Sequence, residues 1–191
     1  MRATFIAAAA LLTAPAVWAQ DAATWKEDVR GWYIGVDTSI GNGCFMSSTF
    51  EGGTAMRVQF NPQLDNLQFI IGDVDWLSIE EGKVYPIALS FGRRPEWTGE
   101  AAAIMMGDMH SLILDVPFTE DRAATFIDDV KQTPNVHVAY QGNEIANLTL
   151  SGTFAAMDEV INCQAEMAEA GGTTVDPFKS GGGTGGSDPF Q

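Results

Sequence analysis

The sequence predicts a mainly β protein, a single antiparallel β-sandwich or barrel-like domain with two short helices near its C-terminal end. Short runs of alternating apolar and polar residues, separated by turn-forming residues, follow one another from residue 31 to residue 150. Apolar residues at helical spacing occur only late, at 119–130 and 153–163. Many short strands with few helices are typical of sandwiches and barrels.

Residues 1–19 have the features of a signal peptide. Arg2 supplies the basic end, residues 5–12 the apolar run, and Val17-Trp18-Ala19 a small-residue cleavage site. The apolar run is too short to span a bilayer, and no later stretch is long enough. We therefore expect a periplasmic or secreted protein.

The rest of the chain divides by composition into three parts. Residues 20–30 are polar, and we expect a leader with little structure of its own. Residues 31–165 form the predicted β-rich domain. Residues 166–191 are predicted to be a flexible glycine-rich tail. The tail carries Asp-Pro-Phe twice, and two such motifs on one flexible segment could bind a partner together.

Alternation of apolar and polar residues sets the predicted strands. In order, they lie at 31–37, 44–50, 54–60, 67–72, 84–91, 101–106, 111–116, 136–140 and 144–150. In the third of these, Met56 and Val58 alternate with Arg57 and Gln59, which are expected on the polar face. Pro86 cannot donate a backbone hydrogen bond, so its strand should be an edge strand or contain a bulge.

The two predicted helices follow turn signals. Thr119 is the expected N-cap of the first helix, and Pro134 ends it. Its apolar stripe consists of Ala123, Phe126, Ile127 and Val130. The second helix is expected to have Thr153 as its N-cap, after a glycine that allows a sharp turn. Its buried side is expected to hold two rows, Phe154, Met157 and Ile161, and beside them Ala156, Val160 and Cys163.

The chain is strongly acidic. Its formal net charge is −15, and removing the signal peptide takes away Arg2, so the mature charge is −16. Such a surface argues against binding to nucleic acid or to anionic membranes. We expect the partner to be another envelope or secreted protein.

The only two cysteines are Cys44 and Cys163. In an exported chain two cysteines predict one disulfide, and no Cys-x-x-Cys motif indicates a redox pair. A bond that closes a loop of about 120 residues stabilises the fold by roughly 4–5 kcal/mol in the chain-entropy treatment.

A resemblance to a known family comes from the last third of the predicted domain. The residues that carry it are an acidic-start helix at Thr119–Val130, a hairpin that ends in Leu148–Gly152, the pair Ala155-Ala156, and the late Cys163. Together they resemble the invasion-associated locus B family of small exported alphaproteobacterial proteins. The resemblance implies a compact β-sandwich in the periplasm or envelope and no catalytic residues.

Candidate catalytic residues are few. No serine lies in a Gly-x-Ser-x-Gly motif. Asp73 and Asp75 could share a strand face, as a hydrolase would need, but no third partner can be named. We therefore predict a non-enzymatic binding module with no cofactor.

An alternative function is Cu(I) binding. Methionine and histidine ligands suit this ion. If residues 107–108 form a hairpin turn, Met106 and Met109 would face each other with His110 beside them, and His137 could complete the site.

The preferred binding candidate is a loop that contains Arg93, Arg94 and Trp97. It has the only adjacent pair of basic residues in the acidic chain, next to a tryptophan. Arginine and tryptophan often dominate binding energies, and loops on a rigid β scaffold often carry function. The alternative is that the arginines neutralise local acidic groups while Trp97 packs onto the core.

Overall fold

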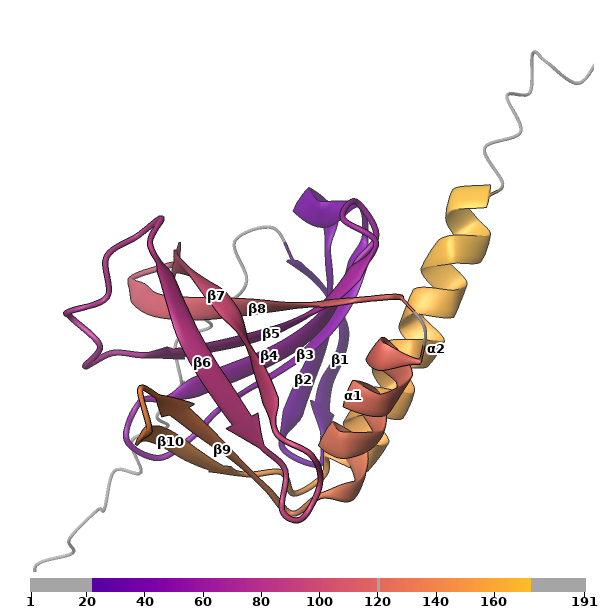
Figure 1. The fold of residues 1–191 in the computed structure, drawn as a ribbon. Helices are drawn as coiled ribbons and strands as arrows, with labels where there is room; N and C mark the ends of the chain where they lie inside the picture. The colour runs from indigo at the N-terminus through magenta and orange to yellow at the C-terminus, as the bar shows by residue number, and fades with distance from the viewer. Residues whose placement is uncertain (1–21, 120, 173–191) are drawn as a thin grey trace, which may run out of the picture.

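The computed structural model describes residues 22–119 and 121–172, which form one sheet and two helices (Figure 1). The strands are β1 (Ala22–Val29), β2 (Trp32–Asp37), β3 (Gly43–Thr49), β4 (Ala55–Asn61), β5 (Asn66–Asp73), β6 (Val84–Ser90), β7 (Trp97–Met106), β8 (Met109–Pro117), β9 (Asn135–Tyr140) and β10 (Asn143–Thr149). The helices are α1 (Arg122–Gln132) and α2 (Thr153–Gly172), and a short 3₁₀ turn, η1 (Thr38–Ile40), joins β2 to β3.

All ten strands belong to one antiparallel sheet, in the order β1-β2-β3-β4-β5-β8-β7-β6-β9-β10. The sheet curves strongly but does not close, so β1 and β10 are its two edges (Figure 1). The predicted class, mainly antiparallel β with two late helices, is confirmed. It is built as one continuous curved sheet.

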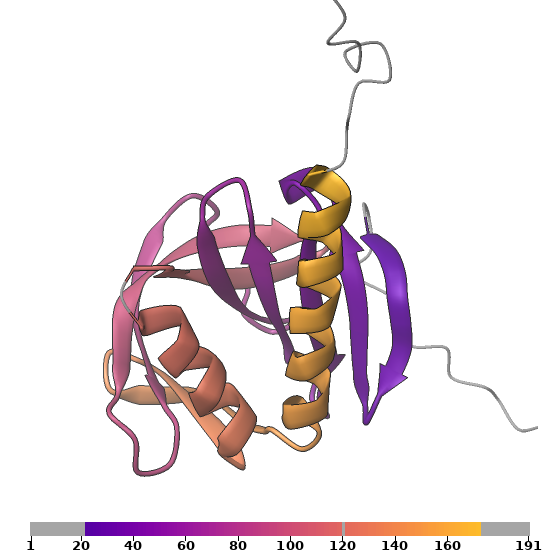
Figure 2. The ribbon, with the colours of Figure 1, turned by 90° about the vertical axis from the view of Figure 1, so that its right-hand side faces the viewer.

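The two helices lie side by side across one face of the sheet (Figure 2). α2 contacts β2 and β3, while α1 contacts β8 and α2. The core fills the space between the helices and this face. Its largest buried side chains include Trp32, Phe69, Phe91 and Phe126.

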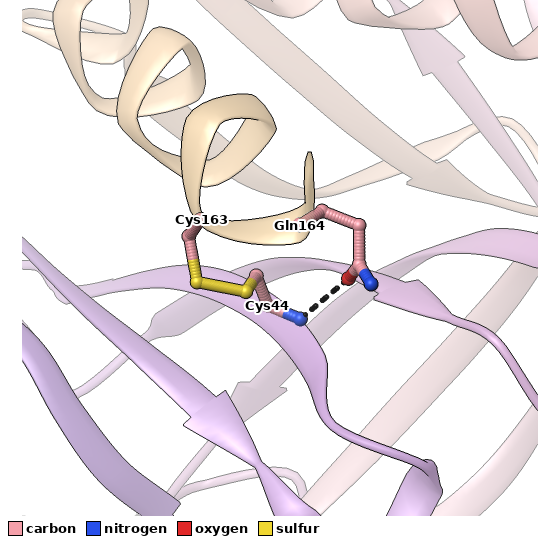
Figure 3. The surroundings of a disulfide bond; sticks show 3 residues. All are labelled: Cys44, Cys163 and Gln164. Carbon is pink, nitrogen blue, oxygen red and sulfur yellow. Dashed lines mark hydrogen bonds between the residues drawn. A yellow bond between two sulfur atoms is a disulfide. The ribbon is translucent and has the colours of Figure 1, made fainter. Parts of the chain in front are cut away.

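The predicted disulfide between Cys44 and Cys163 is present and fixes α2 to the sheet (Figure 3). Cys44 lies on β3, and the two Cα atoms are 6.0 Å apart. Both side chains are fully buried. In addition, the backbone N–H of Cys44 donates to Gln164 Oε1 at 2.9 Å, so the contact joins helix and strand at two points.

The N-terminal boundary of the sheet differs from the prediction. Ala22–Val29 was expected to have little structure, yet it forms the edge strand β1. Pairing explains the difference, because β1 is a mostly exposed strand that hydrogen-bonds to β2 and contributes only Trp25 and Val29 to the packing of the core.

The strand that contains Pro86 is not an edge strand, because β6 pairs with both β7 and β9. Its pairing with β9 begins only at Ile87, however. Pro86 therefore lies where β6 has a partner on one side alone, and its missing N–H is tolerated there.

The helices also differ from the prediction in detail. The N-cap of α1 is Asp121 rather than Thr119, and no side chain caps this end. Thr153 does not cap α2 by accepting a hydrogen bond. Instead, its buried hydroxyl donates to a backbone carbonyl, with Val130 O and Leu150 O both at 2.8 Å, and so ties α2 to the end of α1.

α2 buries the whole of one expected row but only Met157 of the other. Phe154 is 57% exposed and Ile161 37% exposed, whereas Ala156, Met157, Val160 and Cys163 are buried. The helix also continues to Gly172, beyond the expected domain end at residue 165. The predicted signal peptide and the two Asp-Pro-Phe motifs lie outside the described residues.

Candidate functional site

The loop between β6 and β7, residues 91–96, is held against α1 at one end of the sheet. Phe91 is fully buried, with its ring 5.6 Å from the Phe126 ring in an edge-on arrangement. The backbone N–H of Arg94 donates to Phe91 O at 3.1 Å and closes the turn. The packing of Phe91 against Phe126 thus fixes the position of the charged residues in the loop.

Trp97, the first residue of β7, is directed inward. Its ring lies 5.1 Å from that of Phe126 at an interplanar angle of 84°. Its indole N–H donates to Asp129 Oδ2 at 2.7 Å. Tryptophan with both its ring and its N–H engaged in this way is a structural residue, so only the remaining exposed part of Trp97 is available to a partner.

Arg94 is also engaged within the protein. Its Nη1 lies 2.7 Å from Asp129 Oδ1, which makes an ion pair although the N–H does not point straight at that oxygen. Its Nη2 donates to Gln132 Oε1 at 3.0 Å. Because Asp129 is only 2% exposed, Arg94 and Trp97 together supply the charge and the hydrogen bond that this buried carboxylate needs.

Arg93 in the loop and Arg122 in α1 form no ion pair within the described residues. Arg93 is exposed, and Arg122, in the first turn of α1, has its guanidinium 5.2 Å above the Trp97 ring. Of the eight lysines and arginines in the described part of the chain, five form ion pairs. The three without one are Arg30, Arg93 and Arg122. Of these three, Arg122 lies over the Trp97 ring, and Arg93 precedes Arg94 in the loop.

A hollow of about 320 Å³ separates this loop from α1, and we call it the Arg94–Arg122 hollow. Its lining consists of Arg94, Pro95, Glu96, Trp97, Thr98, Arg122, Thr125 and Asp129. Asp129 is paired with Arg94 there, and Arg122, which also lines the hollow, forms no ion pair among the described residues. Arginine binds carboxylates in a two-pronged geometry, so the hollow can receive an anionic group.

Sequence reasoning found one side of this hollow and missed the other. Of the predicted residues, Arg94 and Trp97 line the hollow, and Arg93 is exposed in the loop but does not line it. Arg122 and Asp129 come from a helix far along the chain. No local pattern marks either residue, because their role depends on how α1 docks against the loop.

The four candidate copper ligands are not brought together. Met106 and Met109 are paired across the predicted hairpin turn, as expected. His110, the next residue along β8, points to the opposite face and pairs with Met105. His137 lies on β9 opposite Ser90, beyond the first residue of β7. Measured along β7 at about 3.3 Å per residue, that first residue is about 30 Å from Met106 at the other end of the strand.

His137 has its own acidic neighbour instead. Its Nδ1 lies 2.6 Å from Glu144 Oε2 on β10. Within residues 22–119 and 121–172, no group of three or more histidine, cysteine, aspartate or glutamate side chains could hold a metal ion. Of the four candidate copper ligands, only Met106 and Met109 lie together on one face of the sheet.

The carboxylates considered for hydrolysis have a local structural role. Asp73 ends β5, where it accepts hydrogen bonds from the Thr54 hydroxyl and from the backbone N–H of Asp75 at 2.9 Å. Asp75 itself is exposed in the turn that follows. Neither residue lines the Arg94–Arg122 hollow.

A row of buried polar side chains crosses the opposite face of the sheet and was not predicted. Arg57 and Gln59, expected at the surface, are 1% and 4% exposed. Arg57 Nη2 lies 2.6 Å from Asp37 Oδ2, and its guanidinium lies 3.7 Å above the Phe45 ring. Gln59 and Gln68 continue the row towards Asp115, hydrogen-bonded side chain to side chain.

Both members of the ion pair in this row have a shifted pKa. Burial alone would raise the pKa of Asp37, but hydrogen bonds from Ser39 and Arg57 and the charge of Arg57 outweigh it and lower that pKa. Burial lowers the pKa of Arg57, partly offset by Asp37. Arg57 stays charged at neutral pH, because an arginine pKa begins far above this range. Since Arg57 is paired with Asp37, and Gln59, Gln68 and Asp115 are joined by side-chain hydrogen bonds, the row has a structural role.

Two features bear on where the protein works. A buried disulfide indicates an oxidising setting outside the cytoplasm. In the described ranges, neither helix has the length and apolar character needed to cross a bilayer.

A scan of protein-family models finds no match for the chain, nor do searches of curated proteins and of solved structures. The resemblance to the invasion-associated locus B family therefore remains a prediction. The functional argument has to come from the geometry of the site itself.

Proposed function

We propose that this protein is an exported, non-enzymatic binding module of the periplasm or envelope. Its binding site is the Arg94–Arg122 hollow, and its ligand is a carboxylate-bearing segment of another envelope or secreted protein. A protein with a formal net charge of −15 repels acidic partners in general, so such a partner needs a local positive site. The hollow is that site.

One observation carries the proposal. Among the described residues, three lysines and arginines form no ion pair, and of these Arg122 lines the hollow while Arg93 precedes Arg94 in the loop. An acidic chain could readily have neutralised them, as it neutralises Arg94 with Asp129. Arginines beside a tryptophan ring are the side chains that most often dominate protein-binding energies.

The arrangement of Arg94, Trp97 and Asp129 fits a preorganised binding surface. The buried Asp129 holds the Arg94 side chain in place, and Phe126 holds Trp97. Arg122 then lies over a fixed ring rather than on a free surface. Side chains that are already ordered lose less conformational entropy when a ligand binds.

A defined acidic peptide tests the proposal. A fluorescently labelled peptide with alternating glycine and glutamate would be titrated against the protein at low salt, with fluorescence anisotropy as the readout. We expect Arg93→Gln/Arg122→Gln to weaken binding by about tenfold, the equivalent of one lost charge-assisted hydrogen bond.

The matched control is Arg30→Gln/Lys83→Gln, which removes the same charge from exposed side chains outside the hollow. This control should change the affinity by less than about twofold. Equal losses in both variants would show that general charge alone attracts the peptide. An absence of peptide binding to the wild-type protein would also overturn the proposal.

A further inference from the structure

The sequence that follows α2 carries chemical groups that complement the Arg94–Arg122 hollow. Its two Asp-Pro-Phe motifs lie at residues 176–178 and 188–190. Each motif supplies one carboxylate and, two positions later, an aromatic ring. Proline has a fixed φ and restricts the residue before it to an extended conformation, so the spacing between the aspartate and the phenylalanine varies little. Each motif therefore presents a negative charge and an apolar group together.

The hollow offers a contact to both of these groups. Arg122 lines it, is exposed and forms no ion pair among the described residues. Pro95 is exposed and the Trp97 ring is half-buried, so both present apolar surface to an incoming side chain. The Glu96 carboxylate also lines the hollow, where it accepts a hydrogen bond from Ser90 Oγ at 3.0 Å. An aspartate closely followed by a phenylalanine matches this combination of cation and apolar surface.

The two helices limit how far the end of α2 lies from the hollow. The start of α2 meets the end of α1, where Lys131 Nζ lies 2.6 Å from Asp158 Oδ1, and the helices diverge from there (Figure 2). From Asp158, α2 runs about 21 Å to its end at Gly172. From Lys131, α1 runs back about 13 Å to Arg122. With the paired side chains included, Gly172 lies no more than about 50 Å from Arg122, whatever the angle between the helices.

Only the second motif spans this distance for every angle between the helices. Asp188 follows Gly172 by sixteen residues, which extend to about 53 Å, whereas the four residues to Asp176 extend to about 13 Å. Five of the nine residues between the motifs are glycines, and a glycine-rich segment of sixteen residues spans about 20–25 Å on average. A ligand tethered at such a range has an effective concentration on the order of millimolar. A weak contact is therefore enough to occupy the hollow.

We propose that residues 188–190 of the same chain occupy the Arg94–Arg122 hollow. The Asp188 carboxylate binds Arg122, and the Phe190 ring packs against Pro95. The motif then competes with the carboxylate of a partner protein, which has to displace it before it can bind. This inference rests on the proposed function and adds a regulation of the same site.

Competition in the full-length mature protein tests the inference. The glutamate-glycine peptide described above would be titrated at low salt against the wild-type protein, Asp188→Asn and Asp176→Asn. We expect Asp188→Asn to bind the peptide about threefold to tenfold more tightly, because the hollow no longer holds a carboxylate of its own chain. Asp176→Asn is the matched control, since it removes the same charge from the other motif, and it should change the affinity by less than about twofold. Equal gains in both variants would indicate a general charge effect and overturn the inference.

A second measurement detects the contact directly. Arg122→Lys places an amine in the hollow, and a water-soluble carbodiimide joins an amine to a neighbouring carboxylate through an amide bond, taking up the water that is lost. We expect mass spectrometry of the monomer to find residue 122 joined to Asp188. The control Arg30→Lys places the amine outside the hollow and should give no such link. A link found only between two copies of the chain would overturn the intramolecular contact.

The inference and the proposed function fail in different ways. If Asp188→Asn binds the peptide no more tightly than the wild-type protein, or if no link to Asp188 forms, the inference is wrong. The proposed function would still stand, provided that Arg93→Gln/Arg122→Gln weakens peptide binding. If the peptide binds to none of these proteins, both proposals fail.

Discussion

At the scale of single residues, the charged side chains of the site divide into two kinds. Arg94 and Asp129 neutralise each other, with Trp97 donating to the same carboxylate. Arg93 and Arg122 have no such partner in the described part of the chain. Substituting Arg94 would therefore disturb folding as well as binding, because it would leave the buried Asp129 without its cation. Variants that separate the two effects have to be made at Arg93 and Arg122.

The ion pair between Asp37 and Arg57 gives a prediction about acid stability. The folded protein lowers the pKa of Asp37, so this group stabilises the fold above its unfolded pKa of about 3.9. The contribution is lost as the pH falls through the folded pKa. We expect Asp37→Asn to be less stable than the wild-type protein near neutral pH, with the gap narrowing as the pH falls from about 5 to about 2.

Urea unfolding at several pH values measures this gap. Because both proteins share all other titrating groups, their difference isolates Asp37. A gap that stays constant down to pH 2 would show that the charge of Asp37 does not stabilise the fold.

The sequence predicted only those residues of the site that lie close together in the chain. The pair Arg93-Arg94 and the nearby Trp97 stand out by composition alone. Which arginine is neutralised depends on Asp129 and Gln132 at the far end of α1. The buried row through Arg57 was missed for a related reason, since alternation predicts two faces but does not predict that the polar face will also be buried.

At the scale of elements, periodicity predicted the strands within the folded region and was less reliable for α2. Two apolar rows run along this helix, and the sequence does not say how the helix is rotated on the sheet. The disulfide settles the rotation, because Cys163 must face Cys44 on β3. The row that contains Cys163 is therefore buried, and Phe154 and Ile161 are left outside.

The rotation of α2 can be tested by comparing two alanine substitutions. Met157 is fully buried, so Met157→Ala should lower the free energy of unfolding by about 2–5 kcal/mol. Phe154 is 57% exposed and contacts the Lys131 ammonium 4.5 Å from its ring centre. Phe154→Ala should cost less than about 1 kcal/mol.

Urea denaturation followed by circular dichroism provides both values for α2. Similar losses for Met157→Ala and Phe154→Ala would mean that the helix packs with a different face. Phenylalanine is larger than methionine, yet Phe154→Ala is expected to lower the free energy of unfolding less than Met157→Ala. Residue size alone would predict the opposite order.

At the scale of the whole molecule, the sheet is one open layer whose two halves meet at the β5–β8 pair. The helices cover the core on one face, and α2 reaches across to the N-terminal strands. The disulfide spans a sequence separation of 119 residues and thus constrains most of the described chain at once. Few single features of this fold act over so great a length.

Removal of the disulfide should therefore be costly. We expect Cys44→Ala/Cys163→Ala to lower the free energy of unfolding by about 4 kcal/mol, since the unfolded chain gains the entropy of a long open loop. Urea unfolding of the variant and of the oxidised wild-type protein gives the difference. A loss below about 1 kcal/mol would show that packing of α2 alone holds the helix in place.

The position of Cys163 also orders events during biogenesis. Cys44 precedes Cys163 by 119 residues, and the sequence between them contains no other thiol. Until synthesis has reached residue 163, a disulfide at Cys44 can form only with a thiol of another molecule. A chain cut short before α2 would therefore keep Cys44 without its intramolecular partner and would remain open to mixed disulfides.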